Sequence, residues 1–140
     1  MTVAYRDDFR AWCLDQARLL QSISNESLDI EHLADEVRCM GASEEDNLEN
    51  HMIVLFEHLL KCLYQPSRRS GSWDGSIREQ RKMIRKRLKK SPSLVPLIDR
   101  IASDAYEVAI IRASNQMQIP ERFLPQQMPF SFEEAMENPF

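Results

Sequence analysis

Histidine, cysteine and carboxylate side chains could bind a metal or catalyse a reaction, and their spacing in this chain matches no complete motif. His32 and Glu36 lie four residues apart, as ligands do in HExxH, but the second histidine is absent. His51 and His58 share one edge of a predicted helix, yet no Glu-x-x-His occurs to suggest a di-iron bundle. We interpret all three histidines as solvated or boundary residues, and keep a metal site or bundle enzyme around His51 and His58 as a weak alternative.

The three cysteines, Cys13, Cys39 and Cys62, are widely spaced and form no CxxC, which favours free thiols in a reducing cytoplasm. Cys62 follows His58 by four residues, so the two can meet on one helix face, but no electropositive pocket is indicated for a reactive thiolate. Glycine-rich phosphate loops and G-x-S-x-G elbows are absent. We therefore expect no catalytic residue, no metal and no cofactor, which disfavours an enzyme.

Charge is the feature with a clear pattern. The formal net charge of −4 conceals an acidic block from Glu26 to Glu57, with ten acids and one base, and a basic block from Arg68 to Lys90, with ten bases and two acids. At 100° per residue, four of these bases fall within about 60° of arc on one helix. This row consists of Arg78, Lys82, Arg85 and Lys89.

Two kinds of partner suit such a row. The acidic block of this chain, or of a second copy, could supply carboxylates, and exposed ion pairs of that kind determine the choice of partner more than stability. Nucleic-acid phosphates are the alternative, but the pI of about 5.4 disfavours it because nucleic-acid-binding domains are usually basic. The only aromatic residues near the predicted basic helix are Tyr64 and Trp73, and two are too few to form a platform on which bases stack.

The connection 65–75 is unusual because Arg68 and Arg69 stand close to Trp73. Two interpretations stay open. These side chains could form a docking site for an anion or a protein. Alternatively, Trp73 fills a gap between helices while the arginines cap carbonyls at the end of the preceding helix.

The elements that must position these residues are helical, because only 3 glycines occur in 140 residues and the frequent turns of a β-sandwich are missing. Gly41 is expected to end the second helix and Ser43 to begin the third. Pro66 ends the third helix, and Ser93 is expected to cap the fifth. Apolar periodicity predicts helices at 8–22, 29–40, 44–64, 76–90 and 94–116.

We expect residues 1–140 to form a single all-α domain, an antiparallel bundle of about five main helices. The proline-rich tail, 117–140, is too apolar for a solvated linker and should pack on the bundle, with one short helical turn begun by Ser131 and Glu134. No apolar run is long enough to span a membrane, and the first residues do not resemble a secretory signal. These features predict a cytoplasmic protein without membrane contact.

Several blocks in fixed order resemble a family of small bacterial proteins, abundant in cyanobacteria, classified as domain-of-unknown-function family 29. The resemblance covers nearly the whole chain and implies an all-helical fold, with no established activity. Departures from it are Cys62, Gly71 and Met128, which replaces a usual cysteine. The blocks include Asp8-Phe9-Arg10-Ala11-Trp12, Leu28-Asp29-Ile30-Glu31-His32-Leu33-Ala34-Asp35-Glu36, Tyr64-Gln65-Pro66, Ile77-Arg78-Glu79-Gln80-Arg81 and Ser91-Pro92-Ser93-Leu94.

The sequence thus favours a non-enzymatic, cytoplasmic protein-interaction or self-association module that docks through its basic helix and loop. The alternative is a nucleic-acid-binding accessory protein that uses the same side chains. The candidate binding residues are Arg68, Arg69, Trp73, Arg78, Lys82, Arg85 and Lys89.

Overall fold

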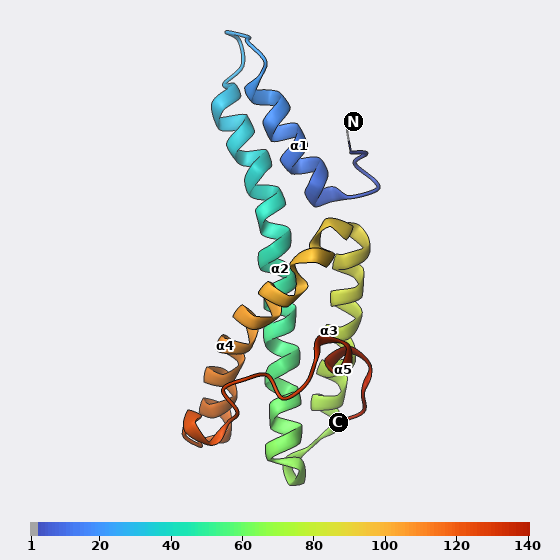
Figure 1. Ribbon diagram of the computed structural model, residues 1–140, viewed down its shortest axis with the longest axis vertical. Coiled ribbons are helices and arrows are strands. Elements are labelled where there is room, and N and C mark those ends of the chain that lie inside the picture. The colour runs from blue at the N-terminus through green and yellow to red at the C-terminus, as the bar shows by residue number, and fades with distance from the viewer. Residues whose placement is uncertain (1–2) are drawn as a thin grey trace. The chain divides into compact units, whose positions relative to one another are not determined.

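The computed structural model describes residues 3–140, and within them it contains helices and no strand (Figure 1). The all-α prediction is confirmed. Short 3₁₀ turns occupy Pro66–Arg68, Pro92–Leu97 and Glu121–Phe123. The five α-helices of this range are α1 (Phe9–Gln21), α2 (Ile30–Tyr64), α3 (Gly71–Lys90), α4 (Ile98–Met117) and α5 (Phe132–Glu137).

Contacts divide the chain into two compact units. Unit 1 consists of residues 1–47 and 86–97, and unit 2 of residues 48–85 and 98–140. The helices α2 and α3 each contribute residues to both units. That the whole chain forms one domain stays a prediction, as does the antiparallel order of its helices. Within the described range, no helix has the length and apolar character needed to cross a membrane.

Helix α1 begins where the sequence predicts. Asp8 is its N-cap, and the Asp8 carboxylate accepts a hydrogen bond from the Ala11 backbone N–H at 2.9 Å. The same carboxylate also accepts hydrogen bonds from the backbone N–H and the hydroxyl of Ser93. One side chain therefore starts α1 and fixes the turn that follows α3 within unit 1.

The predicted break at Gly41 is wrong, because α2 runs for 35 residues without interruption. Gly41 has no positive φ angle and is buried. A Cβ atom added there would lie 3.0 Å from Cys13 Cβ and 3.3 Å from the Arg10 carbonyl oxygen. The glycine thus permits close approach of α1 to α2 and ends nothing. Ser43, expected as an N-cap, donates its hydroxyl to the Cys39 carbonyl oxygen inside the helix.

Helix α3 starts at Gly71, five residues before the predicted start at Ser76. The Ser70 carbonyl oxygen accepts hydrogen bonds from the N–H groups of Trp73 and Asp74. Two glycines cost the helix roughly 1 kcal/mol each relative to alanine. Contacts of Trp73 and burial of Ile77 within unit 2 offset that cost, and neither is visible in the local sequence.

The start of α4 also differs from expectation. Residues 92–97 form a 3₁₀ helix that contains Pro96, and α4 begins at Ile98. Pro96 has no N–H and so cannot take part in regular α-helical bonding, which favours the tighter turn. At the other end, Gln118 adopts a φ of 55°, and the Ile119 N–H bonds to the Ser114 carbonyl oxygen. This Schellman-type termination stops α4 without a glycine.

The tail residues contribute to the core of unit 2. Ser131 and Glu134 form the predicted capping box that starts α5. Phe130 is buried, with its ring centroid 5.5 Å from that of Phe56 and 6.4 Å from that of Tyr106. The other fully or nearly buried tail side chains are Leu124, Ala135 and Met136.

Replacing Gly41 tests the close contact of α1 and α2. We expect Gly41→Ala to lower the free energy of unfolding by about 1 kcal/mol, because overpacking costs about 1–3 kcal/mol and exceeds the gain in helix propensity. Urea unfolding followed by circular dichroism measures this. Gly75→Ala is the matched control, since a Cβ there meets nothing within 4 Å, and it should stabilise by about 0.5–1 kcal/mol. Equal stabilisation by both variants would contradict the contact.

Candidate functional site

The ten bases from Arg68 to Lys90 divide into those with internal partners and those without. Arg69, Arg85, Arg87 and Lys90 pair with carboxylates. Arg81 donates to backbone carbonyls. The remaining five form no ion pair or hydrogen bond with any residue in the part of the chain that is described. They are Arg68, Arg78, Lys82, Lys86 and Lys89, all exposed.

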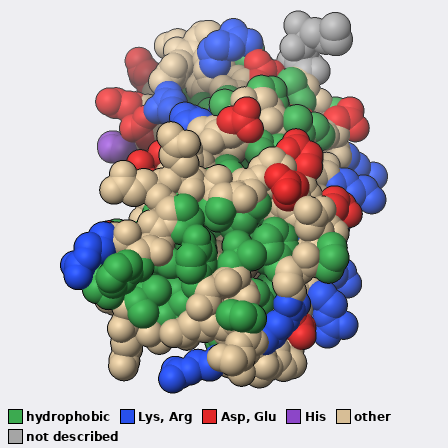
Figure 2. Space-filling view, turned by 60° about the horizontal axis from the view of Figure 1, so that its bottom comes forward, with side chains coloured by type: hydrophobic (Ala, Val, Ile, Leu, Met, Phe, Trp, Pro, Cys, Tyr) green, Lys and Arg blue, Asp and Glu red, His purple; other side chains and the backbone are tan. Residues whose placement is uncertain are grey.

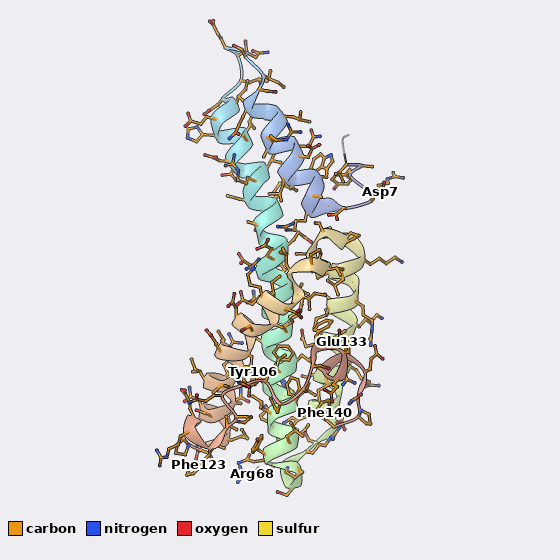
Figure 3. The ribbon with its side chains drawn as sticks, in the orientation of Figure 1. Asp7, Arg68, Tyr106, Phe123, Glu133 and Phe140 are labelled. Atoms are coloured by element: carbon orange, nitrogen blue, oxygen red, sulfur yellow. The ribbon has the colours of Figure 1, made fainter. Side chains whose placement is uncertain are left out.

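The loop before α3 uses its side chains internally. The Arg69 guanidinium bonds to Asp74 Oδ1 through Nε at 2.8 Å and Nη2 at 2.7 Å, which raises the pKa of Arg69. Trp73 is half-buried, and Lys61 Nζ lies 4.9 Å from the centroid of its ring. Arg68 is exposed at the lower end of the view in Figure 3. The two adjacent arginines therefore differ, because Arg69 is paired with Asp74 and Arg68 is exposed, whereas the sequence analysis treated them as a pair.

A chain of polar contacts continues from Trp73 into unit 2 and links two buried charges through the exposed Gln116. Lys61 Nζ donates to Gln116 Oε1 at 2.6 Å, and Gln116 Nε2 donates to the Glu57 carboxylate. Glu57 and Lys61 are 4% and 7% exposed. One amide therefore links two buried opposite charges, which is the arrangement that a low-dielectric interior requires. Sequence reasoning missed this chain because its members lie up to 59 residues apart.

Two arginines of α3 hold the end of α5. Arg81 donates to the carbonyl oxygens of Ala135 at 2.9 Å and Asn138 at 2.6 Å, and burial lowers the pKa of its guanidinium. Arg85 Nη2 lies 3.2 Å from both the Met136 carbonyl oxygen and Glu137 Oε1. Positive groups near a helix C-terminus complement its dipole. Arg85 therefore has a partner in the tail, and the acidic block of α2 does not supply it.

Arg78 and Lys82 are the exposed members of the row in unit 2 that form no ion pair or hydrogen bond with a described residue. Beside Arg78, a cavity of about 180 Å³ is also lined by Arg69, Arg81 and Phe140. Phe140 is labelled in Figure 3. Three guanidinium groups around a small hollow suit a carboxylate or a phosphate group. Lys89, the fourth member of the predicted row, is exposed and belongs to unit 1.

In unit 1 the acidic block of α2 contacts the basic helix through a buried carboxylate, that of Glu44. Glu44 is 4% exposed and accepts a hydrogen bond from the Ser91 hydroxyl. Arg87 Nη1 and Lys90 Nζ lie 3.7 and 3.5 Å from Glu44 Oε1. Lys90 Nζ also lies 4.3 Å from the centroid of the Phe9 ring. One buried carboxylate of α2 therefore serves as counterion to two bases of α3.

The histidine and cysteine candidates have structural partners. His51 Nδ1 bonds to Gln80 Oε1 at 2.7 Å, and His58 Nδ1 bonds to the Val54 carbonyl oxygen at 2.8 Å. No group of three metal-ligating side chains lies close enough to hold an ion within residues 3–140. Burial raises the pKa of the Cys13 and Cys62 thiols, which disfavours a reactive thiolate at either position.

The model of a family described as domain of unknown function DUF29 matches residues 4–140. The chain belongs to this family. A solved crystal structure from Rhodospirillum rubrum, described as an alpha-helical protein of unknown function, shares its fold with a TM-score of 0.77. That protein is 19% identical, and the match covers 99% of this DUF29 chain and 92% of the other. None of the curated proteins matches this DUF29 chain.

Hydrophobic side chains also gather on the surface of this DUF29 protein. Figure 2 shows a broad apolar area with lysine and arginine side chains at its margins. In unit 2, the Arg122 guanidinium lies 5.0 Å from the ring centroid of Phe123. Apolar areas with a polar margin are typical of surfaces that contact other proteins. The large exposed apolar side chains of unit 2 are Leu63, Tyr64, Ile111 and Phe123.

Glu44 provides a stability prediction for unit 1. Glu44→Gln removes the negative charge beside Arg87 and Lys90 while keeping the size of the side chain. We expect the free energy of unfolding to fall by about 2 kcal/mol, because the half-buried Arg87 and the exposed Lys90 lose their counterion and the Ser91 hydroxyl loses a charged acceptor. Chemical denaturation measures the loss. Glu36→Gln, at an exposed position, is the control and should change stability by less than about 0.5 kcal/mol. Equal effects of the two variants would contradict the network.

The pair His32–Asp29 gives a pH prediction at the start of α2. His32 Nδ1 lies 2.6 Å from Asp29 Oδ2, and this hydrogen bond raises the pKa of His32 and lowers that of Asp29. A raised folded pKa means that the stabilising contribution is present at pH values below the unfolded pKa of histidine and is lost as pH rises through the folded pKa. We expect Asp29→Asn to lower the His32 pKa in an NMR titration. The control, Asp46→Asn, should leave the His32 pKa unchanged. A His32 pKa that stays the same in Asp29→Asn would refute the pairing of His32 with Asp29.

Proposed function

We propose that this DUF29 chain is a non-catalytic, cytoplasmic interaction module that binds an acidic protein surface through the exposed bases of α3. The observation that carries the proposal is the lack of any carboxylate partner for Arg78 and Lys82 within the described residues, although neighbouring bases of α3 are paired. We call these two side chains the docking pair. The same proposal extends to the other predicted binding residues, Arg68, Arg69, Trp73, Arg85 and Lys89.

Repulsion between the two bases of the docking pair favours an acidic partner. Arg78 and Lys82 lie four residues apart on one helix, and like charges at this spacing destabilise a helix by about 0.2–0.5 kcal/mol. An acidic partner surface would remove that penalty and gain attraction across the contact. Arg69 and Arg81 already have acceptors next to the docking pair. Because Arg69 and Arg81 are held by these acceptors, Arg78 and Lys82 would be the side chains free to contact the partner.

A second copy of the chain is the partner that we favour. Four exposed acids of unit 1 form no ion pair or hydrogen bond within the described part of the molecule, so each copy presents unpaired charges of both signs. Contact between these two different surfaces would be a head-to-tail association of the kind that builds rings or filaments. The four acids are Glu26, Glu31, Glu36 and Asp46.

Light scattering of the intact chain at about 50 mM and about 500 mM salt tests this association, since the higher salt shortens the screening length severalfold. We expect a mass above that of the monomer at low salt and a monomer at high salt. Arg78→Glu with Lys82→Glu should be monomeric at both. The control, Arg6→Glu with Arg112→Glu, makes the same change in net charge at exposed bases elsewhere and should behave like the unmodified chain.

Two results would overturn the proposal. The first is a monomer at every protein and salt concentration. The second is an equal loss of association in the control variant. A fluorescence-anisotropy titration with mixed DNA and RNA completes the test. Salt-sensitive binding that disappears only in Arg78→Glu with Lys82→Glu would assign the docking pair to phosphates and refute the protein-binding proposal.

A further inference from the structure

A cavity of about 430 Å³ lies in unit 2 between α4 and the tail. It is separate from the docking pair, and none of the predicted binding residues lines it. Tyr106 of α4 and Glu133 of α5, both labelled in Figure 3, line it from two elements that the tail connects. Its volume falls in the range of about 300–1,000 Å³ that is usual for small-molecule sites.

One wall of this cavity is apolar. Tyr106 is 3% exposed, and its hydroxyl donates to the Pro125 carbonyl oxygen at 2.6 Å. Burial raises the pKa of Tyr106 to about 12, so the hydroxyl stays a neutral donor to the tail. This hydrogen bond ties the tail to α4 beside the cavity. Ala102, Met128 and Phe132 supply the remaining apolar lining.

The charged side chains that line the cavity are all acidic. Three carboxylates line the cavity from separate turns of the chain, and no lysine or arginine does. Asp99 lies in the first turn of α4, Glu107 about two turns later, and Glu133 in the first turn of α5. None of the three forms an ion pair with a residue of the described range. The neutral polar lining residues are Ser103, Gln126, Gln127 and Ser131.

Dispersed carboxylates and an apolar wall select a particular class of ligand. A divalent metal needs several oxygen ligands at about 2.0–2.6 Å, and within the described residues no such group exists. An alkyl chain bearing ammonium groups instead places its methylenes against an apolar wall and its charges near separate carboxylates. Aromatic rings such as those of Tyr106 and Phe132 also attract organic cations.

We propose that this cavity binds a small aliphatic diamine. The methylene chain lies against Tyr106 and Phe132, and the ammonium groups donate hydrogen bonds to the carboxylates of Asp99, Glu107 and Glu133. The site is independent of the docking pair, so either proposal can be wrong while the other holds.

Isothermal titration calorimetry of the intact chain with 1,6-diaminohexane tests the site, and 1,6-hexanediol is the neutral ligand of matched length. We expect saturable binding of the diamine and none of the diol. The variant Asp99→Asn, Glu107→Gln, Glu133→Gln keeps the shape of the lining and should bind the diamine at least about tenfold more weakly, because the ammonium groups lose their charged partners. Asp104→Asn with Glu121→Gln, at exposed acids outside the cavity lining, should bind normally.

A second variant tests the cavity itself. Ser103→Trp places a large side chain at an exposed lining position, so it should remove binding while the circular dichroism spectrum and thermal midpoint stay near those of the unmodified chain. Equal affinity for the diol, equal weakening by both sets of neutral substitutions, or undiminished binding to a folded Ser103→Trp chain would each overturn the proposal.

Discussion

The buried face of α2 is the constraint on which the rest of the structure depends. This one helix supplies Ala34, Gly41 and Glu44 to the interior of unit 1, and Phe56 with Leu59 to that of unit 2. Helices α1, α3 and α4 each contact α2 within one of the two units. Burial of apolar area is the dominant favourable term in folding. In unit 1, α1 can approach α2 closely because Gly41 has no side chain. In unit 2 the tail contributes an aromatic side chain to this face, since Phe130 packs on Phe56.

The same long helix carries eight of the 22 acids, and their positions determine which bases find partners. Glu44 and Glu57 turn inward and are satisfied by Ser91, Arg87 and Lys90 in unit 1 and by Gln116 in unit 2. Other acids of α2 pair locally, as Asp35 does with Arg38. Among the residues that the structure describes, Arg78 and Lys82 of α3 form no ion pair with a carboxylate of α2. A chain with nearly balanced charge can in this way expose unpaired charges of both signs.

The sequence predicts what depends on local pattern and misses what depends on distant contacts. The start of α1 near Asp8 and the Ser131–Glu134 capping box depend on local pattern, and both are confirmed. Gly41 was misjudged because a glycine that ends a helix and a glycine inside one look alike in sequence, and the difference lies in its neighbour Cys13. Arg81 is one base among ten in its segment. Only the position of α5 distinguishes it from Arg78, and no local signal could have selected it.

Helix α5 connects the two proposed sites of unit 2. Its C-terminal end is held by Arg81 and Arg85, while Ser131 and Glu133 at its N-terminal end line the tail cavity. With six residues, α5 is too short to be stable by itself, so its position depends on those arginine contacts. A substitution at Arg85 would therefore disturb the cavity as well as the α3 row, and its effect on partner binding could not be assigned to either site. Arg78 and Lys82 make no contact with the tail through hydrogen bonds or ion pairs within the described residues. Their replacement changes the charge of the row while leaving the contacts that hold α5 in place.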